Sequence, residues 1–324
     1  MQRFKQAISG CLLAGLAVWT VPASGAAPQV RTQAPGFYRM MLGDIEVTAL
    51  SDGTHPFPVD TVMAHVSAPA IARDLARAGL SAPVQGAINA FLLNTGTQLI
   101  LIDTGAGALY GDCCGKLLAN LRAAGYRPEQ VDQVFLTHMH KDHVGGILEG
   151  SAMAFPHAVL RVNQADAAYW LSAASRDAAP AFLRSFFDSA VAATAPYIAA
   201  GRFQSFADHA QLAPGIVATT ARGHTEGHTT FTITSRGQAL LAWGDIVHVA
   251  AIQLPEPGAT VTYDTDGAAA AATRRALLDR AARQHLLIGA AHIAFPGLGH
   301  VRKNGAGYDW IPINYDAAPA SPLQ

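Results

Sequence analysis

The segment at residues 137–146 constrains this chain more than any other feature of its sequence. Within six positions it holds three histidines and an aspartate, namely His138, His140, Asp142 and His143. It directly follows the apolar run at residues 134–136, which predicts a buried strand. Alternate side chains of an extended backbone point the same way, so the first two histidines would share a face, and a turn near Lys141 would bring the other two groups close.

Such a cluster would be costly without a bound cation, because charged imidazoles that lie close together repel each other. Neutral imidazole and carboxylate groups are ligands for zinc, manganese, iron or cobalt. The segment therefore indicates a metal site rather than a solvated histidine-rich loop.

The N-terminal residues have the pattern of a cleaved export signal. Basic side chains come first, residues 8–18 are apolar, and small residues follow, so cleavage is predicted after Ala26 or Ala27. The apolar run is short for a transmembrane helix, and an uncleaved membrane anchor is the alternative. We expect residues 1–26 to be a signal peptide and the mature protein to be periplasmic or secreted, with no stable membrane insertion.

Residues 27–324 are predicted to form a single domain, because no Pro/Gly/Ser-rich linker, charge run or composition shift divides them. The hydrophobic content of 50% supports a sizeable core, and the formal net charge of −1 argues against a nucleic-acid partner. Cys113 and Cys114 are the only cysteines of this part, and neighbours in sequence can form only a strained disulfide. We expect a structural or incidental role for them, with redox catalysis as the alternative.

Apolar runs bounded by turn residues alternate with helical segments along the chain. Strands are predicted at residues 38–50 (two, around a turn), 87–93, 98–102, 131–136, 159–162, 216–220, 229–234, 238–243 and 285–288. Helices are predicted at residues 116–124, 165–171, 181–199 and 267–283. Mixed strands and helices over this length indicate a layered α/β (α+β) domain.

Three more potential ligands follow predicted strands. His224 comes after the strand at 216–220, Asp245 after that at 238–243, and His292 after that at 285–288. Loops at strand ends are where a scaffold gathers reactive groups from distant parts of a chain. Taken alone, each of these residues is more typical of a hydrogen-bonded structural side chain than of a ligand.

The order of all these residues, His-x-His-x-Asp-His followed by a later His, Asp and His, resembles that of the metallo-β-lactamase superfamily. The resemblance covers nearly the whole mature chain and implies an αββα four-layer sandwich with a dinuclear metal site at one edge of its two sheets. It implies that one ion is bound by His138, His140 and His224, and the other by Asp142, His143 and His292. Asp245 would bridge both ions, and Asp103 and His228 would support the site without binding metal.

Residues 34–40, 49–54, 291–300 and 307–315 resemble, more narrowly, the methyl parathion hydrolase family. This resemblance implies an exported homodimer that hydrolyses neutral organophosphate triesters through an aromatic-lined entrance. The aromatic positions correspond here to Tyr110, Trp170 and Phe186. Trp170 and Phe186 also fit the apolar faces of their helices, so a core role is the alternative. Tyr110 stands where the family has Phe, and residues 54–67 diverge, so the substrate range stays open.

Two divalent ions, which we expect to be zinc, with manganese, cobalt or iron as alternatives, would lower the pKa of a shared water and let its hydroxide attack the substrate. Phosphotriester hydrolysis is the leading hypothesis, because an aryloxide leaving group needs little protonation and the sequence reveals no obvious acid besides the ligands. A lactone or aryl ester is the alternative substrate for the same centre.

Other classes of function lack their expected signals. No Gly-x-Ser-x-Gly motif is present, which disfavours a serine hydrolase. A di-iron redox protein would carry an acid in place of a ligand histidine or an attached flavin domain, and neither is found. A non-catalytic metal-binding protein could lack Asp245 or His292, but both are present.

Overall fold

The computed structural model describes residues 27–317; the predicted signal peptide lies outside this range. Residues from Pro35 onward form one unit, to which the following description refers. Within the described range, no helix has the length and apolar character needed to cross a membrane.

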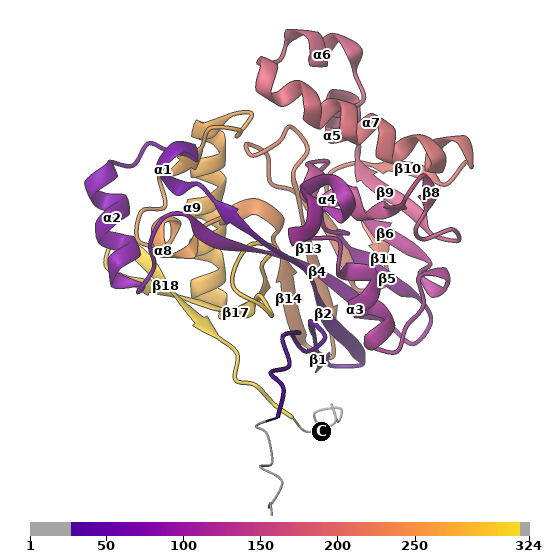
Figure 1. Cartoon of the computed structure of the whole chain (residues 1–324), viewed down its shortest axis with the longest axis horizontal. Coiled ribbons are helices and arrows are strands. Elements are labelled where there is room, and N and C mark those ends of the chain that lie inside the picture. Colours follow the sequence, from indigo (N-terminus) through magenta and orange to yellow (C-terminus); the bar gives the residue numbers. More distant parts are fainter. Residues whose placement is uncertain (1–26, 318–324) are drawn as a thin grey trace, which may run out of the picture. The chain divides into compact units, whose positions relative to one another are not determined.

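Two seven-stranded sheets organise the described residues, and each is built from one half of the chain (Figure 1). In spatial order the first sheet contains β1 (Phe37–Leu42), β2 (Ile45–Phe57), β4 (Val84–Asn94), β5 (Leu99–Ile102), β6 (Gln133–Phe135), β9 (Val159–Asn163) and β10 (Phe203–Phe206). The second contains β11 (Gln211–Ala213), β12 (Ile216–Thr220), β13 (Thr229–Ser235), β14 (Gln238–Ala242), β16 (Leu287–Gly289), β17 (Leu298–Asn304) and β18 (Gly307–Pro312).

Helices connect the strands and cover the sheets. They are α1 (Val59–Val62), α2 (Ala68–Arg77), α3 (Leu117–Ala123), α4 (Lys141–Val144), α5 (Gln164–Trp170), α6 (Ala173–Ala178), α7 (Arg184–Ala199), α8 (Ala250–Gln253) and α9 (Gly267–Gln284). Two small ribbons pair β3 (Met63–Ala64) with β15 (Thr260–Val261), and β7 (Leu148–Glu149) with β8 (Ala152–Met153).

Side-chain alternation along the strands creates three apolar layers between four layers of structure. In β4, Phe91 faces the second sheet, whereas Leu92 faces the helices α3, α5 and α7. In β14, Leu240 faces the first sheet, whereas Leu241 packs towards α9, next to Leu278. Helices, two sheets and a further helix thus form the αββα sandwich that the sequence implied, and the predicted fold class is confirmed.

The predicted strands and helices match structural elements to within three residues at their ends, except that β2, predicted to end at residue 50, continues to Phe57. The helix predicted from residue 181 begins instead at Arg184, because Pro180 leads into the 3₁₀ turn η4 (Ala181–Leu183). The sequence analysis did not predict α2, α6, β10, β11, β17 or β18, nor the short elements α1, α4, α8, β3, β7, β8 and β15.

The sheet topology brings several strand ends to one edge. β5, β6 and β9 run parallel in the first sheet, and β14 runs parallel to β16 in the second. β12 has the same direction as β14, because both are antiparallel to β13. The segments that follow β6, β12, β14 and β16 carry every metal ligand suggested by the sequence, and the loop after β5 carries Asp103.

Candidate metal centre

The loop after β6 presents its histidines as the spacing suggested. The imidazole ring of His138 lies 4.5 Å from that of His140 and 4.1 Å from that of His143, between centroids. His140 precedes the first residue of α4, and this short helix turns Asp142 and His143 back towards the first two histidines. His224, from the loop after β12, completes the cluster, with its ring 4.8 Å from that of His138.

The seven suggested ligands converge on two adjacent groups. His138, His140, His224 and Asp245 form the first group, and Asp142, His143 and His292 form the second. In the first group, Nδ1 of His140 lies 3.0 Å from Nε2 of His224. In the second, Oδ2 of Asp142 lies 3.5 Å from Nε2 of His292.

The carboxylate of Asp245 lies between the two groups. Its Oδ1 is 3.1 Å from Nε2 of both His143 and His292. Its Oδ2 is 3.3 Å from Nε2 of His224 and 3.7 Å from that of His138. Nε2 of His292 is also 3.1 Å from Oδ2, so the carboxylate contacts members of both groups, as a carboxylate shared by two cations would.

Buried polar atoms without hydrogen-bond partners show whether the seven suggested ligands are suited to metal ions. Among the described residues, Nε2 of His138 and His143 and Oδ1 of Asp245 are buried and have no hydrogen-bond partner. Burying polar atoms without partners is costly, and a divalent cation would satisfy these atoms by accepting their lone pairs. Imidazole and carboxylate donors fit zinc as well as manganese, cobalt or iron. The chemistry of the donor set thus fits two divalent ions.

Neighbouring acceptors fix which nitrogen faces the centre in three of the imidazoles. Nδ1 of His143 donates to Asp103 (2.9 Å), that of His224 to Asp264 (2.7 Å), and that of His292 to the carbonyl oxygen of Ala87 (2.8 Å). Because the outer nitrogens carry the protons, the Nε2 lone pairs point inward. Such outer hydrogen bonds orient metal-binding histidines and increase their basicity.

Two residues expected to support the site occupy supporting positions. The Asp103 carboxylate also accepts hydrogen bonds from the backbone N–H and the hydroxyl of Thr137, each 2.8 Å long, which ties the end of β5 to the metal-binding loop. His228 lies outside both ligand groups, and its Nε2 accepts a hydrogen bond from the backbone N–H of Asp245 (3.0 Å). Burial lowers the pKa of His228 to about 3, so it remains a neutral acceptor.

The electrostatics divide the histidines into two kinds. Burial, with the charge of neighbouring imidazoles, lowers the pKa of His138 and His140 well below the usual value. Burial also disfavours charged His143, but the carboxylates around it outweigh this effect and raise its pKa well above the usual value. For His224 burial is likewise outweighed, here by hydrogen bonds to two carboxylates, and its pKa rises to about 9.

Asp245 shows the complementary effect. Burial favours its neutral form, but the imidazoles of His143, His292 and His138 hold its pKa well below the usual value. A buried, ionised carboxylate requires positive charge next to it. Protons on the surrounding imidazoles or bound metal ions supply that charge.

His248 is an additional candidate that the sequence analysis missed. Its Nε2 lies 3.1 Å from Oδ2 of Asp245, and it forms a third possible ligand group with Asp245 and His292. Its ring stacks on that of His292, with centroids 5.5 Å apart and planes 14° apart. The only sequence signal was its position three residues after Asp245. Asp264, the partner of His224, was also missed and stands in no motif.

A cavity of about 140 Å³ opens onto the metal centre. It is lined by His55, Phe57, Pro58, Val62, Gly86, Tyr110, His140, Asp142, Phe186, Asp245, His248, Tyr263 and His292. Tyr110 and Phe186, which the family resemblance assigns to an aromatic entrance, both line this cavity.

Trp170 requires a correction. The sequence analysis placed it at the entrance, but its side chain is 1% exposed and does not line the cavity. It lies instead in the core, with its ring 4.5 Å from that of Phe187 and 5.0 Å from that of His140. The helical pattern identified the apolar face of α5 correctly, but α7 packs over that face and buries Trp170. Phe186, which belongs to α7, lines the cavity.

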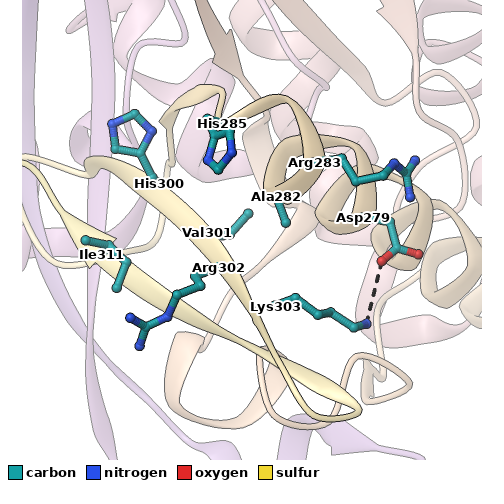
Figure 2. A pocket seen from close by; sticks show the side chains of 9 residues that line it. All are labelled: Asp279, Ala282, Arg283, His285, His300, Val301, Arg302, Lys303 and Ile311. Atoms are coloured by element: carbon teal, nitrogen blue, oxygen red, sulfur yellow. Dashed lines mark ion pairs between the residues drawn. The ribbon is translucent and has the colours of Figure 1, made fainter.

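A larger cavity, of about 420 Å³, lies between α9 and β17 (Figure 2). None of the residues that line it belongs to the two ligand groups. Asp279 and Lys303, which line it, form an ion pair of 3.6 Å and are partly exposed. The smaller cavity is therefore the candidate substrate site, because members of both ligand groups line it.

Comparison with known proteins agrees with this geometry. Residues 83–292 match the model of the Metallo-beta-lactamase superfamily. The structure is similar to that of the hydrolase AbOPH of the beta lactamase superfamily, with 34% sequence identity, a TM-score of 0.84, and coverage of 88% of this chain and 100% of that chain. It is also similar to AidC, a dizinc quorum-quenching lactonase, with 27% identity, a TM-score of 0.81, and coverage of 87% and 98%.

A probable metal-dependent hydrolase from Staphylococcus aureus shares the fold, with 20% identity, a TM-score of 0.69, and coverage of 86% of this chain and 100% of that chain. The family match covers well over half of this chain and includes all the suggested ligands. The chain therefore belongs to the metallo-beta-lactamase superfamily.

Proposed function

We propose that this metal-dependent hydrolase cleaves neutral esters, and that a lactone or another carboxylic ester is its preferred substrate class. The proposal assigns the ligand groups to two divalent ions. His138, His140 and His224 would hold one ion, Asp142, His143 and His292 the other, and Asp245 would contact both. When bound, the ions supply an activated water and polarise the oxygen of the ester.

The observation that carries the choice of substrate is a set of polar aromatic side chains around the cavity. His55, Tyr110, His248 and Tyr263 all line it, next to the exposed side of the second ligand group. Opening a lactone leaves an aliphatic alkoxide, which is a poor leaving group unless a nearby donor protonates it or hydrogen-bonds to it. The leaving group of an aryl phosphotriester needs no such donor.

The two tyrosines are suited to donate hydrogen bonds. Burial, with the negative charge of Asp245 and Asp142 nearby, raises the pKa of Tyr263 well above its usual value. Burial and the same carboxylates raise the pKa of Tyr110. Both hydroxyls therefore keep their protons at neutral pH. In the proposed complex they would orient the carbonyl or the departing oxygen of a substrate.

The similarity to AidC supports the same choice. That protein is a dizinc lactonase, and its structure contains the product N-hexnoyl-L-homoserine. The similarity extends over 87% of the present chain, and it supports zinc as the metal and a lactone as the electrophile.

Hydrolysis of an organophosphate triester is the second candidate. Phe57 and Phe186 provide aromatic surface for an aryl leaving group. The four sequence segments that resemble the methyl parathion hydrolase family favour this candidate as well. The same centre could attack phosphorus, because the fold and the metal site do not fix the electrophile.

A matched pair of substrates tests the proposal. The zinc-loaded protein should hydrolyse an acyl-homoserine lactone with a higher kcat/KM than an aryl dialkyl phosphotriester. In Tyr263→Phe, kcat for the lactone should fall by about 10- to 100-fold, as expected for the loss of a strong hydrogen bond in the transition state. The same variant should leave hydrolysis of a nitrophenyl ester nearly unchanged, which provides the control. Cleavage of the phosphotriester with no cleavage of the lactone would overturn the preference.

We also propose that the mature protein is exported and homodimeric. The N-terminal pattern supports export, and the resemblance to the methyl parathion hydrolase family supports both statements. Cell fractionation with N-terminal sequencing tests the first, and light scattering of the purified protein tests the second. Recovery of an unprocessed N-terminus from the cytoplasm, or a monomer at micromolar concentration, would contradict them.

A further inference from the structure

Cys113 and Cys114 form a pair of thiols beside the substrate cavity. Cys113 is the last residue of the 3₁₀ segment η1 (Gly107–Cys113), and Cys114 follows it. Their Sγ atoms lie 2.8 Å apart, closer than unbonded sulfur atoms normally approach. Cys114 is buried, whereas Cys113 is partly exposed. We propose that this pair is a site of reversible oxidative modification, at which the two side chains close to a disulfide between adjacent residues.

The chain offers these cysteines no other internal partner. The sequence contains three cysteines, and the third, Cys11, lies in the predicted signal peptide. Within the described residues, Cys113 and Cys114 are the only cysteines, and no disulfide joins them there. In an oxidising environment the mature protein can therefore form an internal disulfide only between these two.

The oxidant required is a small-molecule disulfide such as glutathione disulfide. The partly exposed Cys113, as its thiolate, attacks one sulfur of the oxidant, forms a mixed disulfide and releases one thiolate. The Sγ of Cys114 then attacks the Sγ of Cys113, forms the internal S–S bond and displaces the second thiolate. The two protons of the cysteines end on the two released thiols. The protein loses two electrons, and the oxidant gains them.

The surroundings explain why the product should be reversible. Adjacent Cα atoms are about 3.8 Å apart, below the range of about 4.4–6.8 Å in ordinary disulfides, so ring closure strains the backbone. The residues around the pair cannot relax freely. The carboxylate of Asp52 accepts hydrogen bonds from the backbone N–H groups of Ala106, Gly115 and Leu117, and Gly53 packs directly against the carbonyl oxygen of Cys113. A strained disulfide is readily reduced by free thiols.

Oxidation of the cysteine pair would alter the cavity by changing the position of Tyr110. The Cys113 thiol donates a hydrogen bond of 3.3 Å to the carbonyl oxygen of Tyr110, and disulfide formation removes this donor. Tyr110 lines the cavity, with its ring 5.2 Å from that of His55. Because the segment after Cys114 is held by Asp52, we expect the strain to be transmitted into η1.

Peptide mass analysis tests the modification without reference to activity. The full-length protein is incubated with glutathione disulfide, alkylated and digested with trypsin. The peptide of residues 78–116 contains both cysteines and not Cys11. We expect this peptide to take up no alkyl group and to be lighter than the reduced peptide by two hydrogen atoms. Reduction with dithiothreitol should restore two alkylation sites.

Single variants provide the matched controls. In Cys114→Ser, the oxidant should leave a stable glutathione adduct on Cys113, because no second thiol can displace it. Persistence of such an adduct in the wild-type protein, or alkylation of both thiols after oxidation, would overturn the proposal. Hydrogen–deuterium exchange within residues 107–113 should change on oxidation of the wild type and not of Cys113→Ser. Unchanged exchange in the wild type would refute the connection to Tyr110.

Discussion

Replacing Trp170 by alanine distinguishes a role in the core from a role in substrate binding. Trp170 is 1% exposed. A buried aromatic side chain removes about 200 Å² from water, which at about 25 cal/mol per Å² corresponds to an upper limit of about 5 kcal/mol. Truncation of buried Trp or Phe in other cores costs about 3–5 kcal/mol, because a cavity remains. We therefore expect Trp170→Ala to lower the free energy of unfolding by about 3–5 kcal/mol.

Urea unfolding of the metal-loaded protein, together with substrate kinetics, measures this effect. Trp170→Phe is the control: the indole Nε1 has no hydrogen-bond partner within residues 27–317, so the smaller ring loses packing but no hydrogen bond. Phe186→Ala, in contrast, should raise KM and cost less stability, because Phe186 lines the cavity and is only partly buried. A Trp170→Ala protein that unfolds within about 1 kcal/mol of the wild type but has a raised KM would refute the assignment.

Three further substitutions test other parts of the account. Asp103→Asn should weaken metal binding by about 10- to 100-fold in competition with a chromogenic chelator, because His143 loses its charged acceptor; unchanged affinity would contradict this role. Burial raises the pKa of Tyr197 to about 12, so the native state resists losing this proton, and about 2–3 kcal/mol of stability should be lost as the pH rises from 10 to 12. Urea unfolding at these pH values should show a smaller loss in Tyr197→Phe, and an equal loss would exclude Tyr197 as the cause. Asp266→Ala should lower the free energy of unfolding by about 1 kcal/mol, because Asp266 caps the N-terminus of α9 by accepting a hydrogen bond from the N–H of Ala269. Urea unfolding measures this loss, and an unchanged free energy of unfolding would show that the cap contributes nothing.

The layers of the fold could be predicted because the apolar runs were strong and bounded by turn residues. Strands β4 and β14 are apolar on both faces, as expected for sheets covered on both sides. β17 was missed because it ends in Arg302, Lys303 and Asn304, which are exposed and give no apolar run. Its strand conformation is set by pairing with β18, which also escaped prediction.

The suggested ligands were found because each follows a strand in a recognised order. His248 and Asp264 were missed for a physical reason. His248 lies just before α8, and Asp264 lies between β15 and α9, so neither stands in a motif. They reach the centre only through packing of the folded chain, which brings Asp264 within 2.7 Å of His224. Sequence order contains no information about such contacts.

The cavity was the least predictable part of the site. Tyr110 and Phe186 were suggested by family resemblance and line the cavity, but Trp170 was suggested in the same way and lies in the core. His55 and Tyr263 also line the cavity and were not anticipated, and the proposed preference for a lactone rests partly on them. Which of several aromatic residues borders an opening depends on how helices pack, and periodicity specifies only which face is buried.

The central claim, that the two ligand groups hold two divalent ions bridged by Asp245, is tested most directly by counting bound metal. Protein saturated with zinc and freed of excess metal should contain about two ions per chain by elemental analysis. His224→Ala, which alters only the first group, should retain about one ion, and Asp245→Ala should bind both ions more weakly than the wild type. A wild-type protein that holds one ion or none at saturating zinc, or a His224→Ala protein that keeps two with unchanged affinity, would contradict the account.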